Sequence, residues 1–308
     1  MQFAVLLFLL PLSRKIVSGS EWCYQSQVSC NSTCAGPDMW QDVSKLCSGT
    51  SQSPVNIMTR RMHLEEKPAQ FHLDGYQETF HGNLTNTGHT VQLDLPSSIM
   101  ISGGHLAKNY KAIQLHLHWG KNGAPGSEHT IDGEQFPMEM HIVHIKEEYN
   151  SLSQAVKDHT GVAVLGFLFQ ESQSINKNYT SLVEVLPEII KPSNSTMLKD
   201  VSLEMLIPPQ ENLTKYFRYN GSLTTPECAE AVVWTVFENT IPMSREQLTA
   251  FNQLKFSDGA PMVQTYRPVQ PLNGRLVYYS KGDIPVVSWV LLIMSVLFAS
   301  PLPQHSDG

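Results

Sequence analysis

The chain has 308 residues, enough for one large domain or two small ones, and no internal repeat, long linker or low-complexity tract divides it. We therefore expect one domain of about 260 residues, which is long enough to bury a large core. Its 21 Lys and Arg residues against 28 Asp and Glu give a formal net charge of −7. This mildly acidic balance argues against a protein that binds nucleic acid or anionic membranes through charge.

The N-terminal segment predicts a secretory signal peptide. An apolar run covers Phe3–Leu10, and the small residues Ser18 and Ser20 follow it. We expect cleavage near these serines, which would remove residues 1–20 and leave a mature domain over residues 21–280. The alternative interpretation of the apolar run is a buried N-terminal strand.

Five cysteines favour disulfide bonds, because a secreted chain matures in an oxidising compartment. They are Cys23, Cys30, Cys34, Cys47 and Cys228. The same compartment attaches N-linked glycans, and the chain has six Asn-x-Ser/Thr acceptor sequences. These begin at Asn31, Asn83, Asn178, Asn194, Asn212 and Asn220. We expect at least some of them to be glycosylated.

Most of the remaining chain predicts short β-strands. Alternating or continuous apolar runs cover Thr90–Leu95, Ile113–Trp119, Met138–His144, Val162–Phe169 and Ala231–Phe237. Val162–Phe169 is almost wholly apolar, which is typical of a central strand covered on both faces. Asn122-Gly123 directly follows one of these strands and predicts a hairpin turn.

The segment Ile113–Trp119 predicts a strand with two chemically different faces. Its alternating residues are Ile113, Leu115 and Leu117 on an apolar face, and Gln114, His116 and His118 on a polar one. Residues two apart on one strand face stand about 7 Å apart, so the two imidazoles can share one ion. The alternative is a half-solvated strand whose histidines bind nothing.

The segment Met138–His144 completes a candidate metal site. Met138, Met140 and Ile142 fall on one face, and Glu139, His141 and Val143 on the other. If the two strands are neighbours, His141 joins His116 and His118. Three neutral imidazoles with one open position are the ligands of a catalytic Zn²⁺, whereas a closed structural site needs a fourth protein ligand. A zinc protease of the His-Glu-x-x-His type is disfavoured, because the sequence lacks that pattern.

Helices are fewer. Tyr179–Ile190 has apolar residues at helical spacing and ends before Pro192. Ser244 followed by Gln247 is the pattern of a capping box, which predicts a helix from there to about Phe256. Many strands with few helices predict a mainly β, α+β fold in which a large sheet packs with short peripheral helices.

The C-terminal end predicts a lipid-anchor signal. Its uninterrupted apolar part, Val286–Ala299, has 14 residues, or about 21 Å of helix, whereas a bilayer core of about 30 Å needs about 20 residues. The small residues Ser280 and Gly282 precede this run, as in signals that are removed when a glycolipid is attached. We expect residues 281–308 to be removed in this way. A transmembrane tail or secretion is the alternative.

Five motifs in a fixed order carry a family resemblance. They are Gln-Ser-Pro-Val-Asn-Ile (52–57), His-x-His-Trp-Gly (116–120), Gly-Ser-Glu-His (126–129), Glu-x-His-x-Val-His (139–144) and Gly-Ser-Leu-Thr-Thr-Pro (221–226). From about Trp22 to Arg275 the chain resembles an α-class carbonic anhydrase, and its two ends resemble the membrane-anchored type-IV subclass. The resemblance implies zinc-dependent, reversible hydration of carbon dioxide to bicarbonate and a proton. It also implies a twisted, mostly antiparallel sheet of about ten strands, with zinc at the bottom of a conical cleft.

The resemblance assigns roles around the zinc. Gln114 and Glu139 match residues that accept a ring N–H and fix the tautomer of a histidine ligand. Thr224 matches a threonine that accepts a hydrogen bond from the hydroxide nucleophile and donates one to a buried glutamate, here Glu128. Pro226-Glu227 replaces the usual Pro-Pro, which we expect to alter the rigidity of the loop. His129 and His144 are expected to be structural.

The resemblance also places the substrate and the proton. Residues that match the carbon dioxide pocket are Val143, Val164, Leu223 and Trp234, and Thr225 lines the cleft. Taken singly, each apolar residue is more often plain core. Asn86-Thr87-Gly88-His89 resembles the segment that carries the proton shuttle, which makes His89 the candidate, since a cleft histidine titrates near neutral pH. The alternative is an ordinary surface histidine. Thr87 and Gln92 both depart from asparagine, so the solvent path differs.

The type-IV resemblance bears on the disulfides and the location. It implies a Cys47–Cys228 bond that ties the N-terminal segment to the loop 224–226. We favour Cys23–Cys34 for the second bond, which leaves Cys30 over. Ser280 falls in the attachment register of a glycolipid anchor, which predicts an enzyme on the extracellular face of the plasma membrane with bicarbonate transporters as candidate partners. The alternative is a catalytically silent binding ectodomain, but such relatives lack zinc histidines that this chain has.

Overall fold

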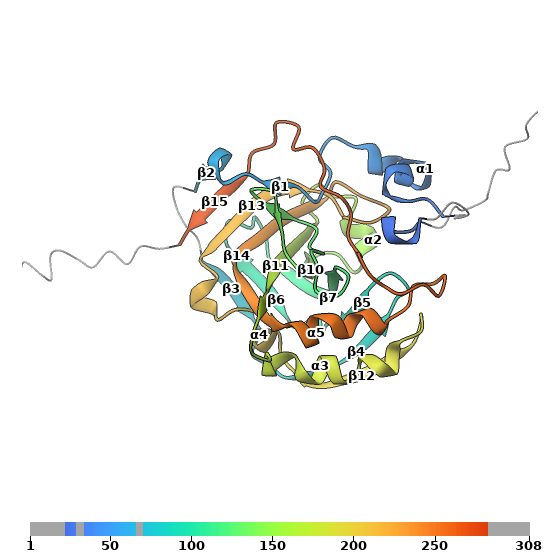
Figure 1. Cartoon of the computed structure of the whole chain (residues 1–308). Helices are drawn as coiled ribbons and strands as arrows, with labels where there is room; N and C mark the ends of the chain where they lie inside the picture. The colour runs from blue at the N-terminus through green and yellow to red at the C-terminus, as the bar shows by residue number, and fades with distance from the viewer. Residues whose placement is uncertain (1–21, 29–33, 66–69, 283–308) are drawn as a thin grey trace, which may run out of the picture.

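One twisted sheet of 12 strands occupies the centre of the computed structural model (Figure 1). The structure describes residues 22–28, 34–65 and 70–282. The predicted signal peptide, Cys30, the acceptor sequence at Asn31 and the apolar run Val286–Ala299 lie outside the described residues. The boundaries predicted for the mature domain therefore stay predictions.

Ten strands form the main path of the sheet. In spatial order they are β12 (Ser195–Val201), β4 (Phe80–Asn86), β5 (Val91–Asp94), β7 (Tyr110–Trp119), β10 (Met138–Lys146), β11 (Val162–Ser172), β14 (Val232–Ser244), β13 (Lys215–Gly221), β15 (Tyr278–Lys281) and β2 (His63–Leu64). The other two strands are β3 (Phe71–Asp74) and β6 (Met100–Gly103), and β6 pairs with both β3 and β7. The pairs β11–β14 and β15–β2 are parallel and the other pairs of the described sheet are antiparallel. The predicted fold class is confirmed.

Small elements surround this sheet. A second sheet contains β1 (Asn56–Ile57), β8 (Thr130–Ile131) and β9 (Glu134–Gln135). The α-helices are α1 (Trp40–Val43), α2 (Leu152–Ala155), α3 (Thr180–Glu184), α4 (Leu203–Leu206) and α5 (Arg245–Ala250). The 3₁₀ helices are η1 (Gln25–Gln27), η2 (Pro37–Met39), η3 (Lys45–Ser48), η4 (Thr59–Arg61), η5 (Lys177–Tyr179), η6 (Leu186–Ile189), η7 (Gln210–Asn212) and η8 (Phe251–Gln253). Within the described ranges, none of the helices is both long and apolar enough to span a bilayer.

The two predicted helices form in shorter pieces. The capping box is present, since the Gln247 N–H donates to Ser244 Oγ at 3.3 Å and the Ser244 N–H donates to Gln247 Oε1 at 3.3 Å. The α-helix that it opens ends at Ala250, and η8 continues the chain to Gln253. Over 179–190 the prediction of one helix is wrong, because α3 ends at Glu184 and η6 follows. Pro187 lies in the first turn of η6, and a proline cannot donate the backbone hydrogen bond that would continue α3.

β11 is the buried centre of the sheet, as its apolar sequence predicts. It lies between β10 and β14, and its residues from Val162 to Phe169 are all buried. Its alternate side chains enter two separate apolar clusters. Ala163 and Leu165 pack in a large cluster with Leu115, whereas Val164 packs in a smaller one with Val143. Both faces of the sheet are therefore covered at this point.

A β-bulge changes the predicted faces of the histidine strand. In the pairing of β7 with β10, Val143 stands opposite Gln114 but His144 stands opposite Ala112, so Ile113 is an extra residue. Ile113 packs against the smaller cluster, on the side of Val143, rather than with Leu115 and Leu117. The prediction that Ile113 shares their face is wrong, because the extra residue shifts the alternation by one position.

The turn at Asn122-Gly123 forms, but the predicted hairpin does not. Both residues have positive φ angles, 55° and 74°. However, the strand that pairs with β7 after this turn is β10, which begins only at Met138. The intervening chain passes through β8 and β9, which pair with each other in the second sheet, where β8 also pairs with β1. Because the loop leaves the main sheet, the local turn does not determine the strand pairing.

Two disulfide bonds hold the N-terminal part of the domain. They join Cys23 to Cys34 and Cys47 to Cys228, the pairs that the sequence analysis favoured. The second bond closes a loop of 181 residues, which reduces the entropy of the unfolded chain and contributes about 4 kcal/mol or more in the loop-closure model. It connects η3 to the segment that follows β13.

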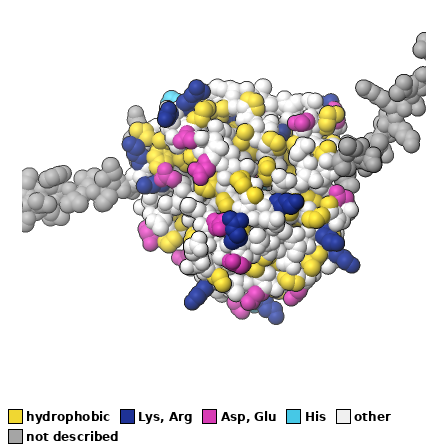
Figure 2. All heavy atoms as spheres, viewed as in Figure 1, with side chains coloured by type: hydrophobic (Ala, Val, Ile, Leu, Met, Phe, Trp, Pro, Cys, Tyr) yellow, Lys and Arg dark blue, Asp and Glu magenta, His cyan; other side chains and the backbone are white. Residues whose placement is uncertain are grey.

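On the face shown in Figure 2, acidic and basic side chains are interspersed with hydrophobic ones.

Candidate metal centre and active site

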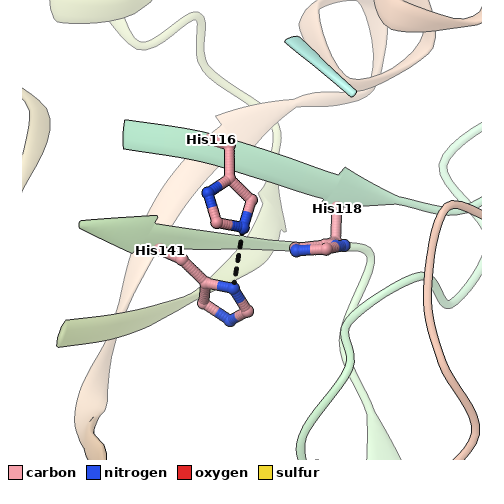
Figure 3. A group of neighbouring side chains, drawn as sticks. All are labelled: His116, His118 and His141. Carbon is pink, nitrogen blue, oxygen red and sulfur yellow. Dashed lines mark hydrogen bonds between the residues drawn. The ribbon is translucent and has the colours of Figure 1, made fainter. Parts of the chain in front are cut away.

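Three histidines from two neighbouring strands converge on one point. His116 and His118 lie on β7 and His141 on β10, where the pairing sets His141 opposite His116. Figure 3 shows the three rings turned toward the space between them. One ring nitrogen of each lies within 4.8 Å of the others. His118 and His141 are buried, whereas His116 is partly exposed and forms the accessible side of the cluster.

The other nitrogen of each ring is bound to an acceptor. His116 Nδ1 donates to Gln114 Oε1 at 2.8 Å, His118 Nδ1 to the Thr265 carbonyl at 2.6 Å, and His141 Nε2 to Glu139 Oε1 at 2.7 Å. These oxygens can only accept, so those three ring nitrogens carry the hydrogens. In neutral rings the remaining nitrogens therefore carry lone pairs, and these lone pairs face one another. They belong to Nε2 of His116, Nε2 of His118 and Nδ1 of His141.

Electrostatics keep these rings neutral. Burial lowers the pKa of His116 well below its ordinary value, and the neighbouring His118 and His141 lower it further. Burial lowers the pKa of His118 to about 4 and also lowers that of His141, although Glu139 opposes the effect on His141. Since metal ions bind the neutral form of imidazole, the site is ready for a cation at neutral pH.

The spacing of the facing nitrogens fits a metal ion. His141 Nδ1 lies 3.3 Å from His116 Nε2, the dashed contact in Figure 3. Two nitrogens that each bind one zinc at about 2.0–2.1 Å in a tetrahedron stand about 3.3 Å apart. His118 Nε2 is buried and makes no hydrogen bond within the described residues. Lone pairs that face each other repel unless a cation lies between them, so these residues fit the ion.

Glu139 organises the ring of His141 from behind. Its Oε2 accepts the backbone N–H groups of Glu128 and His129 at 2.8 Å each, and its Oε1 also accepts from His129 Nδ1 at 2.7 Å. Burial raises the pKa of Glu139, but His129 and His141 outweigh this and hold it well below its usual range. His129, Glu139 and His141 are close enough to hold a metal themselves, yet they bind one another and form a supporting network.

His129 and His144 lie in the core, as expected for structural residues. His129 Nε2 contacts the Tyr219 hydroxyl at 2.6 Å. His144 lies on β10 on the face opposite His141, where Nε2 contacts the Tyr76 hydroxyl at 2.9 Å and Nδ1 donates to the Ala163 carbonyl at 3.3 Å. Both rings therefore have partners away from the three-histidine cluster.

Glu128 and Thr224 meet beside the histidines. Glu128 is buried, its Oε2 lies 3.4 Å from His118 Nε2, and its Oε1 accepts the backbone N–H of Arg267 at 2.8 Å. Burial raises the pKa of Glu128 to about 7, and the neighbouring Thr224 hydroxyl lowers it in part. Oε2 itself makes no hydrogen bond within the described residues. The buried Thr224 lies in the segment between β13 and β14, close to the Cys47–Cys228 bond.

An apolar wall stands next to the three histidines. Val143, Val164 and Trp234 are buried in one cluster, and Leu223 packs against it while staying partly exposed. The ring of Trp234 meets that of His141 edge-on, with centroids 4.7 Å apart. Its Nε1 donates to the Ser222 carbonyl at 3.0 Å, which holds the indole against the loop. Thr225, the next residue after Thr224, is partly exposed.

His89 stands apart from the ligand cluster on the N-terminal side. It lies in the loop between β4 and β5 and is half-buried. Its ring stacks on Trp22 with centroids 3.9 Å apart and an interplanar angle of 12°. Tyr24 approaches the same ring edge-on at 6.5 Å. His89 is thus held by Trp22 and Tyr24, the residues on either side of the disulfide-bonded Cys23.

Comparison with known proteins identifies the family. A family model described as eukaryotic-type carbonic anhydrase matches residues 35–281. The chain belongs to this family. It is 41% identical over 264 residues to carbonic anhydrase 4 of Oryctolagus cuniculus, which covers 85% of this chain and 84% of the relative. Carbonic anhydrase 4 of Mus musculus is 39% identical over 292 residues, 94% of this chain and 93% of its own. Carbonic anhydrase 12 of Homo sapiens is 34% identical, covering 95% of this chain and 82% of the relative.

As a carbonic anhydrase, the protein catalyses the hydration of carbon dioxide. Two contributors to the site carry no sequence signal of their own. The Thr265 carbonyl, which holds His118, is a backbone group 147 residues away. Trp22 reaches His89 from the edge of the domain, 67 positions earlier in the chain. Both contacts depend on how distant segments are packed, which no local pattern encodes.

Proposed function

We propose that this carbonic anhydrase uses Zn²⁺ held by His116, His118 and His141, and that it works at the extracellular surface of a membrane. The observation that supports the metal is the set of facing ring nitrogens, with His116 Nε2 and His141 Nδ1 3.3 Å apart. A zinc ion with an open fourth position is a Lewis acid that makes a bound water acidic near neutral pH.

Thr224 orients the nucleophile in this proposal. Its hydroxyl donates to the Glu128 carboxylate, whose pKa that hydrogen bond lowers. A hydroxyl whose hydrogen is committed to a carboxylate can only accept from a group in the site. Thr224 Oγ1 therefore accepts a hydrogen bond from the attacking oxygen and leaves a lone pair of that oxygen aimed at the substrate. Arg267 holds Glu128 in place through its backbone N–H.

The apolar wall receives carbon dioxide. This substrate offers little to a hydrogen-bond donor, so an apolar surface beside the metal ligands binds it without stranding a polar group. Val143, Val164, Leu223 and Trp234 supply that surface. Thr225 lies at its more exposed margin and gives the bicarbonate product a polar neighbour. Water enters and bicarbonate leaves on the side of the partly exposed His116.

Metal analysis combined with a stopped-flow assay of carbon dioxide hydration tests this proposal. The purified protein should contain one zinc per chain, lose activity when a chelator removes the metal, and regain it when zinc is added. Full activity without metal would overturn the zinc assignment. A protein that holds stoichiometric zinc but does not hydrate carbon dioxide would be the silent ectodomain instead.

His89 is proposed to carry the proton from the site to the solvent. Replacing it by alanine should lower turnover in weak buffer by at least about 10-fold, because proton transfer then depends on water alone. Small imidazole buffers should restore part of the rate, and kcat/KM for carbon dioxide should stay near the original value. The exposed His72 on β3 offers a matched control, since His72→Ala should change nothing. Turnover that responds to neither the His89 variant nor the buffer would remove His89 from the mechanism.

A glycolipid anchor at the end of β15 is the proposed attachment to the membrane. The two disulfides favour an oxidising, secretory compartment, and a short apolar run lies beyond the last strand. Ser280, the predicted attachment residue, is buried in β15, and its hydroxyl donates to the Thr214 carbonyl at 2.9 Å. Attachment there would hold the sheet edge directly at the bilayer. A bicarbonate transporter is the partner that the reaction product favours.

A phosphatidylinositol-specific phospholipase should release active enzyme from intact cells. The released chain should lack residues beyond about Gly282, because the anchor replaces the apolar tail. A chain truncated after Gly282 serves as the control and should appear in the medium without treatment. Recovery of peptides from Val286–Ala299 in the mature membrane-bound protein would contradict the anchor and favour a transmembrane tail.

A further inference from the structure

A surface groove shares no lining residue with the active site described above. Its volume is about 600 Å³. Three segments enclose it: the loop after β11 that leads into η5, the stretch from α4 to η7, and the end of β14. Its walls combine polar side chains with apolar ones, and Pro208, Pro209 and Pro242 are among the apolar ones. Ile175, which also lines it, is 63% exposed and is the most exposed large hydrophobic side chain of the described residues.

Two of the six glycan acceptor sequences border this groove. Asn178 in η5 and Asn212 in η7 both line it, and both side chains are exposed. Neither side-chain amide is hydrogen-bonded to another described residue. Elsewhere, Asn83 Nδ2 donates to Thr85 Oγ1 at 3.1 Å and Asn194 Nδ2 donates to the Glu188 carbonyl at 3.5 Å. The groove therefore has two unengaged amides at its edges.

We propose that Asn178 and Asn212 carry N-linked glycans and that the first sugars of these glycans lie in the groove. The inference rests on the proposed extracellular location, because it needs passage through the secretory pathway. In that pathway, the donor for N-glycosylation is an oligosaccharide bound to a lipid pyrophosphate carrier. The side-chain nitrogen forms a bond to the first sugar carbon as the bond from that carbon to pyrophosphate breaks. The amide loses one proton, and the lipid pyrophosphate leaves.

Covalent attachment explains why sugars would occupy a groove that binds free sugars only weakly. Contacts between a sugar and a protein surface are weak, but a short tether raises the effective concentration to about the millimolar range. The apolar faces of the sugar rings would cover Ile175 and the prolines. The exposed Ser174 and Lys177, which also line the groove, supply donors for sugar hydroxyls. Both tethers start at the groove itself, so neither glycan has to span a distance to reach it.

The first experiment tests which acceptor sequences carry a glycan, and it uses the protein secreted from a eukaryotic host. Enzymatic removal of the glycans in ¹⁸O-water marks each former attachment site as a heavy aspartate in peptide mass spectrometry. The marked peptides should include those of Asn178 and Asn212. Glycans at Asn83 or Asn194 but not at these two sites would overturn this inference and leave the proposed location intact. A secreted chain with no glycan at all would overturn the inference, whereas a chain that never enters the secretory pathway would overturn both.

Hydrogen exchange tests whether the sugars occupy the groove. Three forms are compared: intact, trimmed to the single first sugar, and fully deglycosylated. The intact and trimmed forms should exchange about 2- to 10-fold more slowly than the bare form over 205–212 and 239–242. Asn178→Gln and Asn212→Gln should speed exchange in the same segments, whereas the control variants Asn83→Gln and Asn194→Gln should not. Equal exchange in all three forms would show that the glycans point into solvent and would overturn the assignment of the groove.

Discussion

Replacing His116 or His141 by alanine should abolish both metal binding and carbon dioxide hydration. Each ring supplies one of only three lone pairs in the described cluster, and two ligands hold zinc far more weakly than three. We expect less than about 0.1 zinc per chain after dialysis and activity near the uncatalysed rate. Elemental analysis and the stopped-flow assay measure the two quantities on the same sample.

The control residue for this experiment, His144, lies on the same strand as His141. His144→Ala removes a buried histidine from β10, but its ring contacts Tyr76 and the Ala163 carbonyl on the opposite face. This variant should lower the stability of the protein and still bind one zinc per chain. Circular dichroism of all the variants separates loss of metal from loss of fold. Stoichiometric zinc and near-full activity in His116→Ala or His141→Ala would show that the three-histidine site is wrong.

Thr224→Ala should keep the zinc and lose about 100-fold in turnover, the usual scale for one oriented hydrogen-bonding group. The side chain touches Glu128 and none of the three histidines depends on it for a hydrogen bond. Without the hydroxyl, the attacking oxygen can rotate and its lone pair is no longer aimed at carbon dioxide. The measurement is kcat with zinc content determined in parallel.

Two further variants show whether the hydroxyl or the shape matters. Thr224→Ser retains the hydroxyl and should recover most of the rate, whereas Thr224→Val keeps the branched shape and should be as slow as the alanine variant. Glu128→Gln should also be slow, because an amide can donate to Thr224 and thereby free the hydroxyl to point elsewhere. An unchanged rate in Thr224→Ala would exclude Thr224 from orienting the nucleophile.

The three-histidine cluster was predictable because its residues share one simple periodicity. On β7 the residues Gln114, His116 and His118 alternate along one face, and on β10 Glu139 and His141 do the same. A strand period of two places a histidine and its hydrogen-bond acceptor side by side without any knowledge of the fold. The apolar sequence of β11 similarly indicated a central strand. The roles of Glu128, Thr224 and His89, in contrast, came from motif resemblance rather than from periodicity.

The remaining features depend on packing between distant segments. The extra residue at Ile113 leaves the local alternation of the sequence intact, so the pattern cannot reveal the bulge. The turn at Asn122-Gly123 has the right residues for a hairpin, but the chain after it enters β8, which pairs with β1, more than 70 positions earlier. Pro187 divides the predicted helix, although its position within the first turn of η6 is compatible with helical structure. In each case the local sequence is compatible with both the predicted and the observed structure, and tertiary contacts decide which of the two forms.

The parts of the active site are separated very differently along the chain, which bears on when each becomes functional during folding. The β7–β10 pair brings together His116 and His141, which are only 25 positions apart in the sequence. The contact from His118 to Thr265 spans 147 positions, and the disulfide beside Thr224 spans 181. Contacts of high sequence separation form late because long loops must close first. We therefore expect a nascent chain to capture zinc before Thr224 and Thr265 arrive, so that metal acquisition precedes catalytic competence.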